Sequence, residues 1–488
     1  MKNFTKPGPG RFWMPALASW RGVVCGLLLL GLIAAGCSNP DTPPGTTQGE
    51  EGENPFLRAA ETVALQIPDT VARQTAQSTI ATSYAEAGLF ADANRMMQGL
   101  RLPEIQSYLI AKIATEQSRK GHDSIARTML AAAASLDLSA LTPSTRVVRT
   151  GELARAALRL GDTAAAKRFL DDGRVSAISI ADPFFRTRAV AELAIIYAEA
   201  GFRNDASAML EQAAKGIDGK KMPGSLALGY ISRAFGEIGR PATALATAAA
   251  SPERRVQFDG LLNAAASYAK LGSTDSAVAL LNKAAEVAAS ESEWHSRAPG
   301  WVAVAKQLAG IKEWKPAMEV LKKLQEGSNT LAPAAQFDAA VGIAECLVAL
   351  RLSSQADSAS AQVIRFSQGM SDPNVLGVVA ATITAAAEAY IDSGMTASGI
   401  RLLDHAATVA GSSPAGAERE SLLAQISYDQ ARAGNFTGAI AAYQQLAQPR
   451  ERALALASIG TEYAKAGRKP SAQELKILEA INNNNQRQ

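Results

Sequence analysis

Tyr84-Ala85-Glu86-Ala87-Gly88 is a five-residue phrase that this chain repeats, and the repetition decides the fold. The phrase returns as Tyr197-Ala198-Glu199-Ala200-Gly201, as Tyr268-Ala269-Lys270-Leu271-Gly272 and as Tyr463-Ala464-Lys465-Ala466-Gly467. An alanine stands five residues after the glycine of every copy. Such self-similarity at long intervals is typical of arrays in which one supersecondary unit is stacked many times.

The glycine of the phrase marks a reference point that we call the turn position of each unit. The turn positions are Gly88, Gly121, Gly161, Gly201, Gly239, Gly272, Lys312, Arg351, Gly394, Gly434 and Gly467. Neighbouring turn positions lie 33 to 43 residues apart, so the sequence contains eleven units.

A second column of the repeat supports this register. Seven residues before the turn position stand only small residues, namely Ala81, Ala114, Ala154, Ala194, Ser232, Ala265, Ala305, Ala344, Ala387, Ser427 and Gly460. Apolar residues recur at helical spacing on both sides of the turn, so each unit is predicted to be two amphipathic helices. We expect the glycine to adopt a positive φ where the first helix ends, and the small column to let helices pack closely.

One helical hairpin cannot bury its own apolar face, whereas a stack of hairpins can. The sequence therefore predicts an all-α solenoid over residues 56–481, followed by a disordered polar tail over 482–488. Pro103 and Pro449, and the Ser251-Pro252-Glu253-Arg254 stretch, are expected to begin helices, because proline suits the first helical turn.

The repeat resembles the tetratricopeptide repeat, which places an apolar residue, a small residue, an aromatic, a glycine and an alanine at these relative positions. The resemblance covers roughly residues 65–480, and Tyr84, Tyr197 and Tyr390 are among the residues that match the aromatic column. Most units are near 40 residues, longer than the family's 34, so a HEAT-type or related helical repeat remains an alternative. The resemblance implies a right-handed open superhelix of about eleven repeats that binds proteins or peptides without catalysis.

The N-terminus carries a predicted export signal. Basic residues up to Arg21 precede a short apolar run from Val23 to Ala35, which has the size of a signal-peptide core. Leu32-Ile33-Ala34-Ala35-Gly36-Cys37 resembles a bacterial lipobox, and the resemblance implies cleavage after residue 36 and a diacylglycerol anchor, with palmitate as an acyl chain, on Cys37. Residues 37–55 are rich in Pro, Gly, Thr and Glu and are predicted to be a flexible tether. Because Ser38 follows the cysteine, the lipoprotein rule favours the outer membrane, facing the periplasm.

Composition narrows the functional classes. The 488 residues are 47% hydrophobic and carry a net charge of +3, which becomes −1 once the predicted signal peptide is removed. A near-neutral chain has no general attraction for nucleic acid. The three histidines lie far apart in sequence, so no metal site is expected, and Cys346 is interpreted as a small core residue.

Candidate partner-binding residues come from first-helix positions that flank the core columns. Arg155, Arg159, Arg233, Lys270 and Lys306 make the N-terminal half of these positions mainly basic, whereas the positions from Glu345 to Asp392 are acidic. If these positions line a groove, an acidic segment of a partner would bind its basic half. Trp294 is a further candidate contact, because it lies beside the unit that lacks the turn glycine.

The sequence contains no phosphate-binding loop, no metal-ligand spacing and no catalytic triad, so no cofactor and no catalytic residue are predicted. The leading hypothesis is a non-catalytic, membrane-anchored scaffold that binds a protein or peptide. Two alternatives remain, an outer-membrane glycan-binding lipoprotein and an envelope enzyme built as a helical toroid.

Overall fold

A computed structural model describes residues 54–136, 138–328 and 331–485. These residues form 23 helices and, within the described ranges, no strand. The predicted all-α solenoid is therefore confirmed. The predicted signal peptide, Cys37 and most of the tether lie outside the described residues. The tether was predicted to end at residue 55, but Asn54 already caps the first helix, which begins at Pro55.

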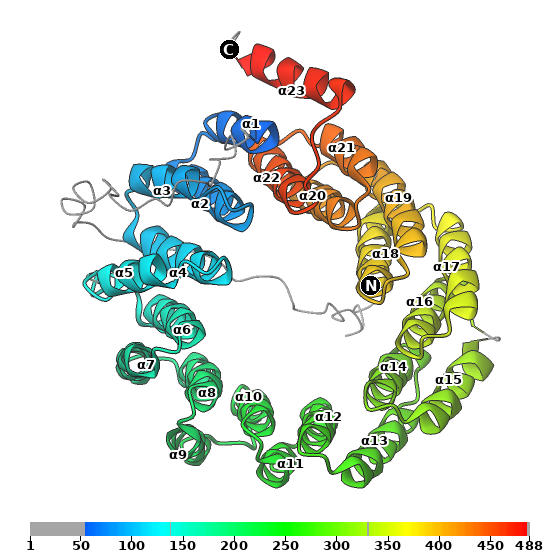
Figure 1. Cartoon of the computed structure of the whole chain (residues 1–488). Coiled ribbons are helices and arrows are strands. Elements are labelled where there is room, and N and C mark those ends of the chain that lie inside the picture. The colour runs from blue at the N-terminus through cyan, green and yellow to red at the C-terminus, as the bar shows by residue number, and fades with distance from the viewer. Residues whose placement is uncertain (1–53, 137, 329–330, 486–488) are drawn as a thin grey trace, which may run out of the picture.

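The first helices of the eleven units form the inner layer of the fold (Figure 1). They are α2 (Thr70–Glu86), α4 (Pro103–Arg119), α6 (Pro143–Arg159), α8 (Pro183–Glu199), α10 (Gly224–Glu237), α12 (Arg254–Lys270), α14 (Trp294–Gly310), α16 (Pro333–Ala349), α18 (Pro373–Asp392), α20 (Ala417–Arg432) and α22 (Pro449–Lys465). The predicted starts at Pro103 and Pro449 are confirmed, whereas α12 begins at Arg254, two residues after Pro252.

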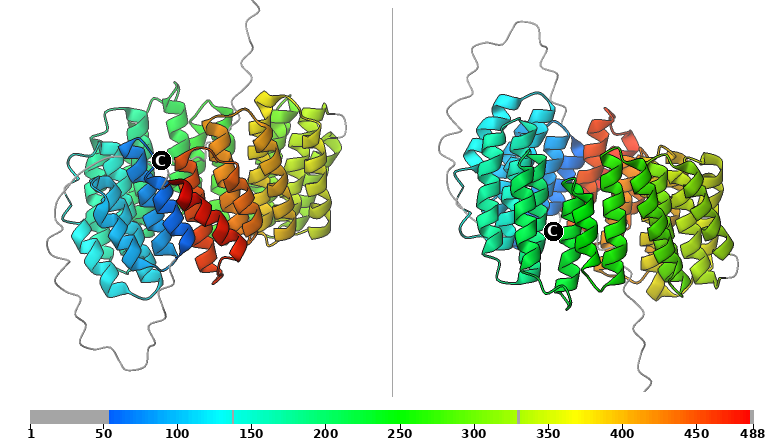
Figure 2. Two further views of the ribbon diagram at one scale, coloured as in Figure 1. Left: turned by 90° about the horizontal axis from the view of Figure 1, so that it is seen from above. Right: turned by 90° about the horizontal axis from the view of Figure 1, so that it is seen from below.

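The second helices form the outer layer. They are α3 (Phe90–Gly99), α5 (Asp123–Ala133), α7 (Thr163–Ile178), α9 (Arg203–Lys215), α11 (Pro241–Ala249), α13 (Thr274–Ala289), α15 (Trp314–Ser328), α17 (Ser353–Gln368), α19 (Thr396–Ser412) and α21 (Phe436–Gln444). Figure 2 shows that the helices of both layers run roughly along the axis of a short cylinder, so the repeats form its wall.

The turn position has the backbone conformation that the sequence predicts. All nine glycines there have φ between 61° and 89°, and Lys312 and Arg351 share this conformation with φ of 65° and 57°. A residue with left-handed backbone conformation ends the first helix and turns the chain back. Backbone N–H groups beyond the turn then donate to the last carbonyl oxygens of that helix, and Leu89, for example, donates to the Tyr84 carbonyl at 2.8 Å. The two units without glycine are thus true members of the array.

The column of small residues is buried in every unit, as predicted. Ser232 and Ser427 use the space for a second purpose, because each hydroxyl donates to the carbonyl of the alanine twelve residues on, Ala244 at 2.8 Å and Ala439 at 2.9 Å. These bonds join the two helices of one unit, so the small column is where the hairpin closes on itself.

The array was expected to be an open superhelix, and this expectation is wrong. The structure is a closed ring, in which α1 (Pro55–Ala64) packs against α22 and α2 and takes the place of the second helix of the eleventh unit (Figure 1). The Phe56 and Tyr463 rings lie 4.7 Å apart, and Lys465 of α22 pairs with Glu86 of α2 at 3.0 Å. One continuous apolar core crosses this seam.

The last helix, α23 (Ala472–Asn485), lies outside α1 instead of filling the eleventh unit. Its sequence explains the displacement. Nine and twelve residues after Gly467 stand Lys476 and Glu479, where the tenth unit has the buried residues Tyr443 and Leu446. The helix also corrects the predicted tail, because it continues past residue 482 to Asn485.

The side chains that α1 offers explain why it fits this place. Ala60, Val63, Ala64 and Ile67 reproduce the small-then-apolar spacing of a second helix, and all four are buried. Apolar side chains buried at a seam contribute roughly 25 cal/mol per Å², so the N-terminal helix stabilises the ring better than the polar α23 would.

By length and composition, one described helix could cross a membrane. It is α18, with 20 residues and a mean hydropathy of 1.5, and its place in the inner layer against α19 accounts for its apolar character.

Candidate functional site

The inner surface of the ring is formed by the exposed sides of the first helices. Near their C-terminal ends, charged side chains pair across neighbouring helices in what we call the ion-pair belt. Its pairs are Glu86–Lys465, Arg155–Glu199, Arg233–Glu192, Lys270–Glu237, Lys306–Glu345 and Arg432–Asp392.

The belt contains four of the five basic residues proposed from the sequence. Arg155 lies 3.1 Å from Glu199, Lys270 and Lys306 lie 2.7 Å from their carboxylates, and Arg233 makes the longest contact at 4.0 Å. Arg159 is exposed at the end of α6 and makes no ion pair within the described chain. These pairings compensate much of the positive charge that the sequence predicted for one half of the groove. A partner-binding role for the five residues stays a prediction.

The opposite end of the inner surface carries exposed apolar side chains. Val148 of α6, Phe185 of α8 and Leu226 of α10 are 51%, 52% and 36% exposed, and each lies in the first two turns of its helix. We call these three residues the inner apolar patch. Because soluble proteins seldom leave large apolar side chains grouped on one surface, such a patch indicates an interaction site.

Aromatic residues lie beside Phe185 of the patch. The Phe184 ring lies edge-on to both Phe185 and Tyr230, with centroids 5.6 Å apart in each case. The guanidinium of Arg188 lies 5.8 Å from the centroid of the Tyr230 ring. Tyrosine and arginine beside apolar anchors are the residue types enriched in binding hot spots.

Trp294 is half-buried. Its ring lies edge-on to Trp301 at 6.0 Å, and it covers Gly327 of α15 so closely that a Cβ there would come within 2.2 Å of the indole. Trp301 is 6% exposed and donates from its indole to the Ala285 carbonyl at 3.3 Å. The structure thus gives Trp294 a packing role, and its contact with a partner stays a prediction.

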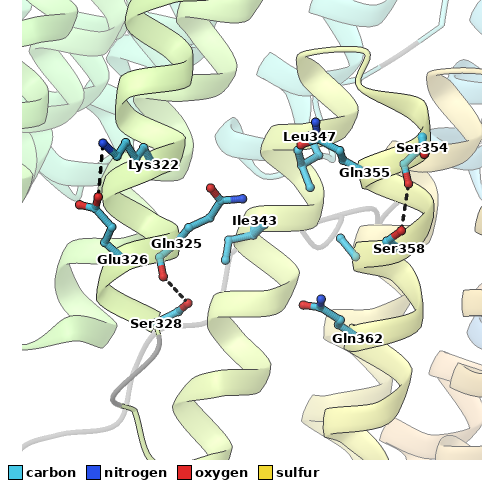
Figure 3. A pocket seen from close by; sticks show the side chains of 11 residues that line it. Lys322, Gln325, Glu326, Ser328, Ile343, Leu347, Ser354, Gln355, Ser358 and Gln362 are labelled. Atoms are coloured by element: carbon cyan, nitrogen blue, oxygen red, sulfur yellow. Dashed lines mark hydrogen bonds and ion pairs between the residues drawn. The ribbon is translucent and has the colours of Figure 1, made fainter.

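A cleft of about 530 Å³ lies on the outer face between α15 and α17 (Figure 3). Ile343 and Leu347 of α16 form its floor, and its walls carry the polar side chains of Lys322, Gln325, Glu326, Ser354, Gln355 and Gln362. None of its eleven lining residues is aromatic. Its single carboxylate, Glu326, is paired with Lys322 at 3.6 Å.

Asp429 is a buried carboxylate in the wall between α18 and α20. Gln425 donates to it at 2.9 Å, and Arg432 lies 3.6 Å away, but one carboxylate oxygen has no hydrogen-bond partner in the described chain. Burial, with the nearby carboxylate of Glu388, raises the pKa of Asp429 to about 7.

The described residues hold no group of three or more His, Cys, Asp or Glu side chains placed to bind a metal ion. Cys346 is completely buried, and burial raises the pKa of its thiol to about 12. A thiol in this state is a poor nucleophile, so the structure gives Cys346 the role of a core residue.

The sequence interpretation missed the inner apolar patch and the seam. A signal for the seam was present, because an amphipathic helix precedes the first unit while the last unit has polar residues at second-helix core positions. Val148 and Leu226 share one column of the repeat, but Phe185 stands in another, so only the tertiary structure shows that the three share one surface.

No protein-family model matches the chain, and no curated protein is significantly similar to it in sequence. Solved structures share its helical character. They include Ton1535 from Thermococcus onnurineus NA1 (15% identity, 77% of this chain and 97% of that chain, TM-score 0.30) and the P58(IPK) TPR domain (13% identity, 76% and 98%, TM-score 0.18). Another is a circular tandem repeat protein with novel repeat topology (16% identity, 87% and 96%, TM-score 0.21).

The geometry of the chain itself defines its class. Eleven units, ten of them complete hairpins, with a left-handed turn residue, a buried small column and an inner layer of first helices make a tetratricopeptide-like α-solenoid. This solenoid is closed into a ring by its own N-terminal helix.

Proposed function

We propose that this protein is a non-catalytic scaffold, anchored by lipid at the bacterial cell envelope, that holds a protein or peptide partner against the inner surface of its ring. The observation that carries the proposal is the inner apolar patch of Val148, Phe185 and Leu226. Its exposed apolar area favours a partner that brings apolar side chains of its own.

The ion-pair belt supports this choice of surface. The charges of the belt are neutralised by one another within the ring, and each exposed ion pair of this kind contributes little free energy. We therefore expect the belt to orient and align a bound partner and to add little to its affinity. The side chains of the inner apolar patch, in contrast, remain exposed and are not covered by other parts of the ring. We therefore place the main contact at the N-terminal ends of α6, α8 and α10.

The two alternatives find less support. A glycan site usually includes an aromatic ring on which a sugar stacks, and the outer cleft between α15 and α17 has none. A glycosidase needs two carboxyl groups facing each other across the substrate. The outer cleft has one carboxylate, which is occupied by Lys322.

A photo-crosslinking experiment in the native cell tests the proposal. We would place p-benzoylphenylalanine at Phe185 on the inner surface and, as a matched control, at Val175, which is 68% exposed on the outer helix α7. We expect a discrete crosslinked protein from position 185 and none from position 175. The reverse result, or equal diffuse labelling from both positions, would rule out the inner surface as the binding site.

The membrane anchor is a separate part of the proposal and rests on the lipobox-like sequence before Cys37. Cys37 precedes the cap residue Asn54 by 17 positions, which at ~3.5 Å per residue allows the ring to stand up to ~60 Å from the lipid surface. Metabolic labelling with an alkynyl palmitate should mark the wild type but not Cys37→Ala, and the wild type should fractionate with outer membranes. An unlabelled wild type, or a mature N-terminus other than residue 37, would remove the anchor from the proposal.

A further inference from the structure

A cavity of about 380 Å³ opens in the ring wall between α12 and α14. Unlike most neighbouring first helices, α12 and α14 barely touch each other. The cavity walls are largely apolar and come from Phe258, Leu262, Val287, Ala288, Pro299 and Ala303.

The sequence of the sixth unit explains why the cavity exists. Phe258 and Leu262 stand where the fifth unit has Ser225 and Gly229 at the same distances from the turn position. These larger side chains hold α14 away, and on α14 the facing residues Pro299 and Ala303 are too short to fill the gap.

The mouth of the cavity carries three carboxylates and two guanidinium groups. Arg255 pairs with Asp259 at 2.8 Å, and Arg254 pairs with Glu291 at 3.6 Å. Glu253 is the carboxylate left over, because it makes no ion pair within the described chain and its side chain does not cap α12. The mouth therefore has an excess negative charge that a cation can compensate.

The cavity lies on the same side of the ring wall as the inner apolar patch. Asp259 and Pro299 hold the same position relative to the turn as Val148 and Leu226. Adjacent packed helices are ~10 Å apart, so an extended segment of about twelve residues would reach from α6 to α14.

We propose that this cavity, with Glu253 at its mouth, receives a large apolar side chain that a partner protein presents next to a lysine or arginine. This inference rests on the proposed scaffold function and adds the chemistry of the partner. An aromatic or long aliphatic side chain suits the apolar walls, and burying one such anchor in a pocket is a common source of binding energy.

Short peptides test the assignment on the full mature chain. The probes are N-acetyl-Gly-Phe-Lys-Gly-amide and its Phe-Glu and Ala-Lys counterparts, with binding followed by saturation-transfer NMR. We expect the Phe-Lys peptide to bind at millimolar concentrations and the other two to bind at least fivefold more weakly. Equal binding of the Phe-Lys and Phe-Glu peptides, or no binding of any of them, overturns the proposal.

Three variants and one matched control locate the site. Ala303→Phe should fill the cavity and abolish binding of the Phe-Lys peptide, and Glu253→Gln should weaken it three- to tenfold. Ala385→Phe is the matched control, because Ala385 occupies the same position relative to the turn on α18 and is exposed. Binding of the Phe-Lys peptide to this variant should equal binding to the wild type. If Ala303→Phe does not fold, Ser296→Tyr narrows the mouth from the first turn of α14 and should also reduce binding.

The outcome is separable from that of the proposed function. If the Phe-Lys peptide still binds to both Ala303→Phe and Ser296→Tyr, the cavity is not its binding site. Crosslinking from position 185 can persist in that case, and the proposed scaffold function then stands. If position 185 gives no crosslink while the Phe-Lys peptide still binds, the inner apolar patch is rejected as the partner-binding surface and the cavity is retained.

Discussion

The side-chain amide of Asn54 donates a hydrogen bond of 2.8 Å to the carbonyl oxygen of Gly460, 406 positions further along the chain. Asn54 also caps α1 by accepting from the Leu57 backbone N–H at 3.2 Å. One residue thus starts the first helix and fixes it to the last unit. Gly460 is the small-column member of that unit, so α1 packs where every other unit packs its own second helix.

Gly460→Val should open the ring. A Cβ at position 460 would lie 2.9 Å from Leu57 and 3.0 Å from Asn54 and Phe56, so a branched side chain displaces α1. We expect a loss of about 3 kcal/mol or more, a larger radius of gyration in small-angle X-ray scattering and tryptic cleavage at Arg58. Gly377→Val is the control, since a Cβ there meets no atom within 4 Å. An unchanged radius of gyration for Gly460→Val would show that α1 does not close the ring in solution.

Lys312→Gly and Arg351→Gly should each stabilise the protein. Both residues hold a positive φ that strains an L side chain by roughly 1–2 kcal/mol, and glycine relieves that strain at the expense of some chain entropy. We expect a gain of about 0.5–1 kcal/mol in each variant, measured as a rise in Tm.

Gly201→Ala makes the complementary test, because its Cβ would meet no atom but its φ is 89°. This variant should lose about 1 kcal/mol. Gly216→Ala, at a φ of −86°, is the matched substitution and should be neutral or stabilising. A similar Tm for all four variants would mean that the turn conformation is not under strain.

Asp429→Asn should change how stability depends on pH. The pKa of Asp429 is raised to about 7 in the folded state, so the folded protein binds a proton that the unfolded chain releases near pH 4. The contribution of Asp429 to the free energy of unfolding of the wild type therefore decreases as pH rises from about 4 to about 7, and it remains at the lower value above pH 7. The asparagine variant should lack this fall and gain on the order of 2 kcal/mol over wild type between pH 5 and pH 8. Parallel Tm curves for the two proteins would contradict the buried, protonated carboxyl.

The Cys346 thiol should resist alkylation in the native protein. Its complete burial and a pKa raised to about 12 leave little thiolate at pH 8. We expect iodoacetamide to modify it at least a hundredfold more slowly in buffer than in 8 M urea, as followed by mass spectrometry. Rapid modification of the folded chain would indicate that the wall around α16 opens readily.

Much of this architecture is local and could be predicted from the sequence. The left-handed turn residue, the two amphipathic faces and the small column act within about forty residues. The repeat shows the turn residue and the small column eleven times, and the apolar face of the second helix is missing only from the eleventh unit. Lys312 and Arg351 were placed correctly because the neighbouring columns fixed their register even without glycine.

The sequence by itself therefore determined the unit, its number and its buried columns, since these depend on side-chain periodicity and backbone conformation within one hairpin. Only the tertiary structure decided that the array closes, because closure requires the small rotation at each interface to sum to a full turn. Closure of the ring also requires that α1 fill the place of the eleventh second helix. The polar residues Lys476 and Glu479 make α23 unsuitable for that place. Closure in turn brings Lys465 of α22 beside Glu86 of α2, the belt pair that crosses the seam.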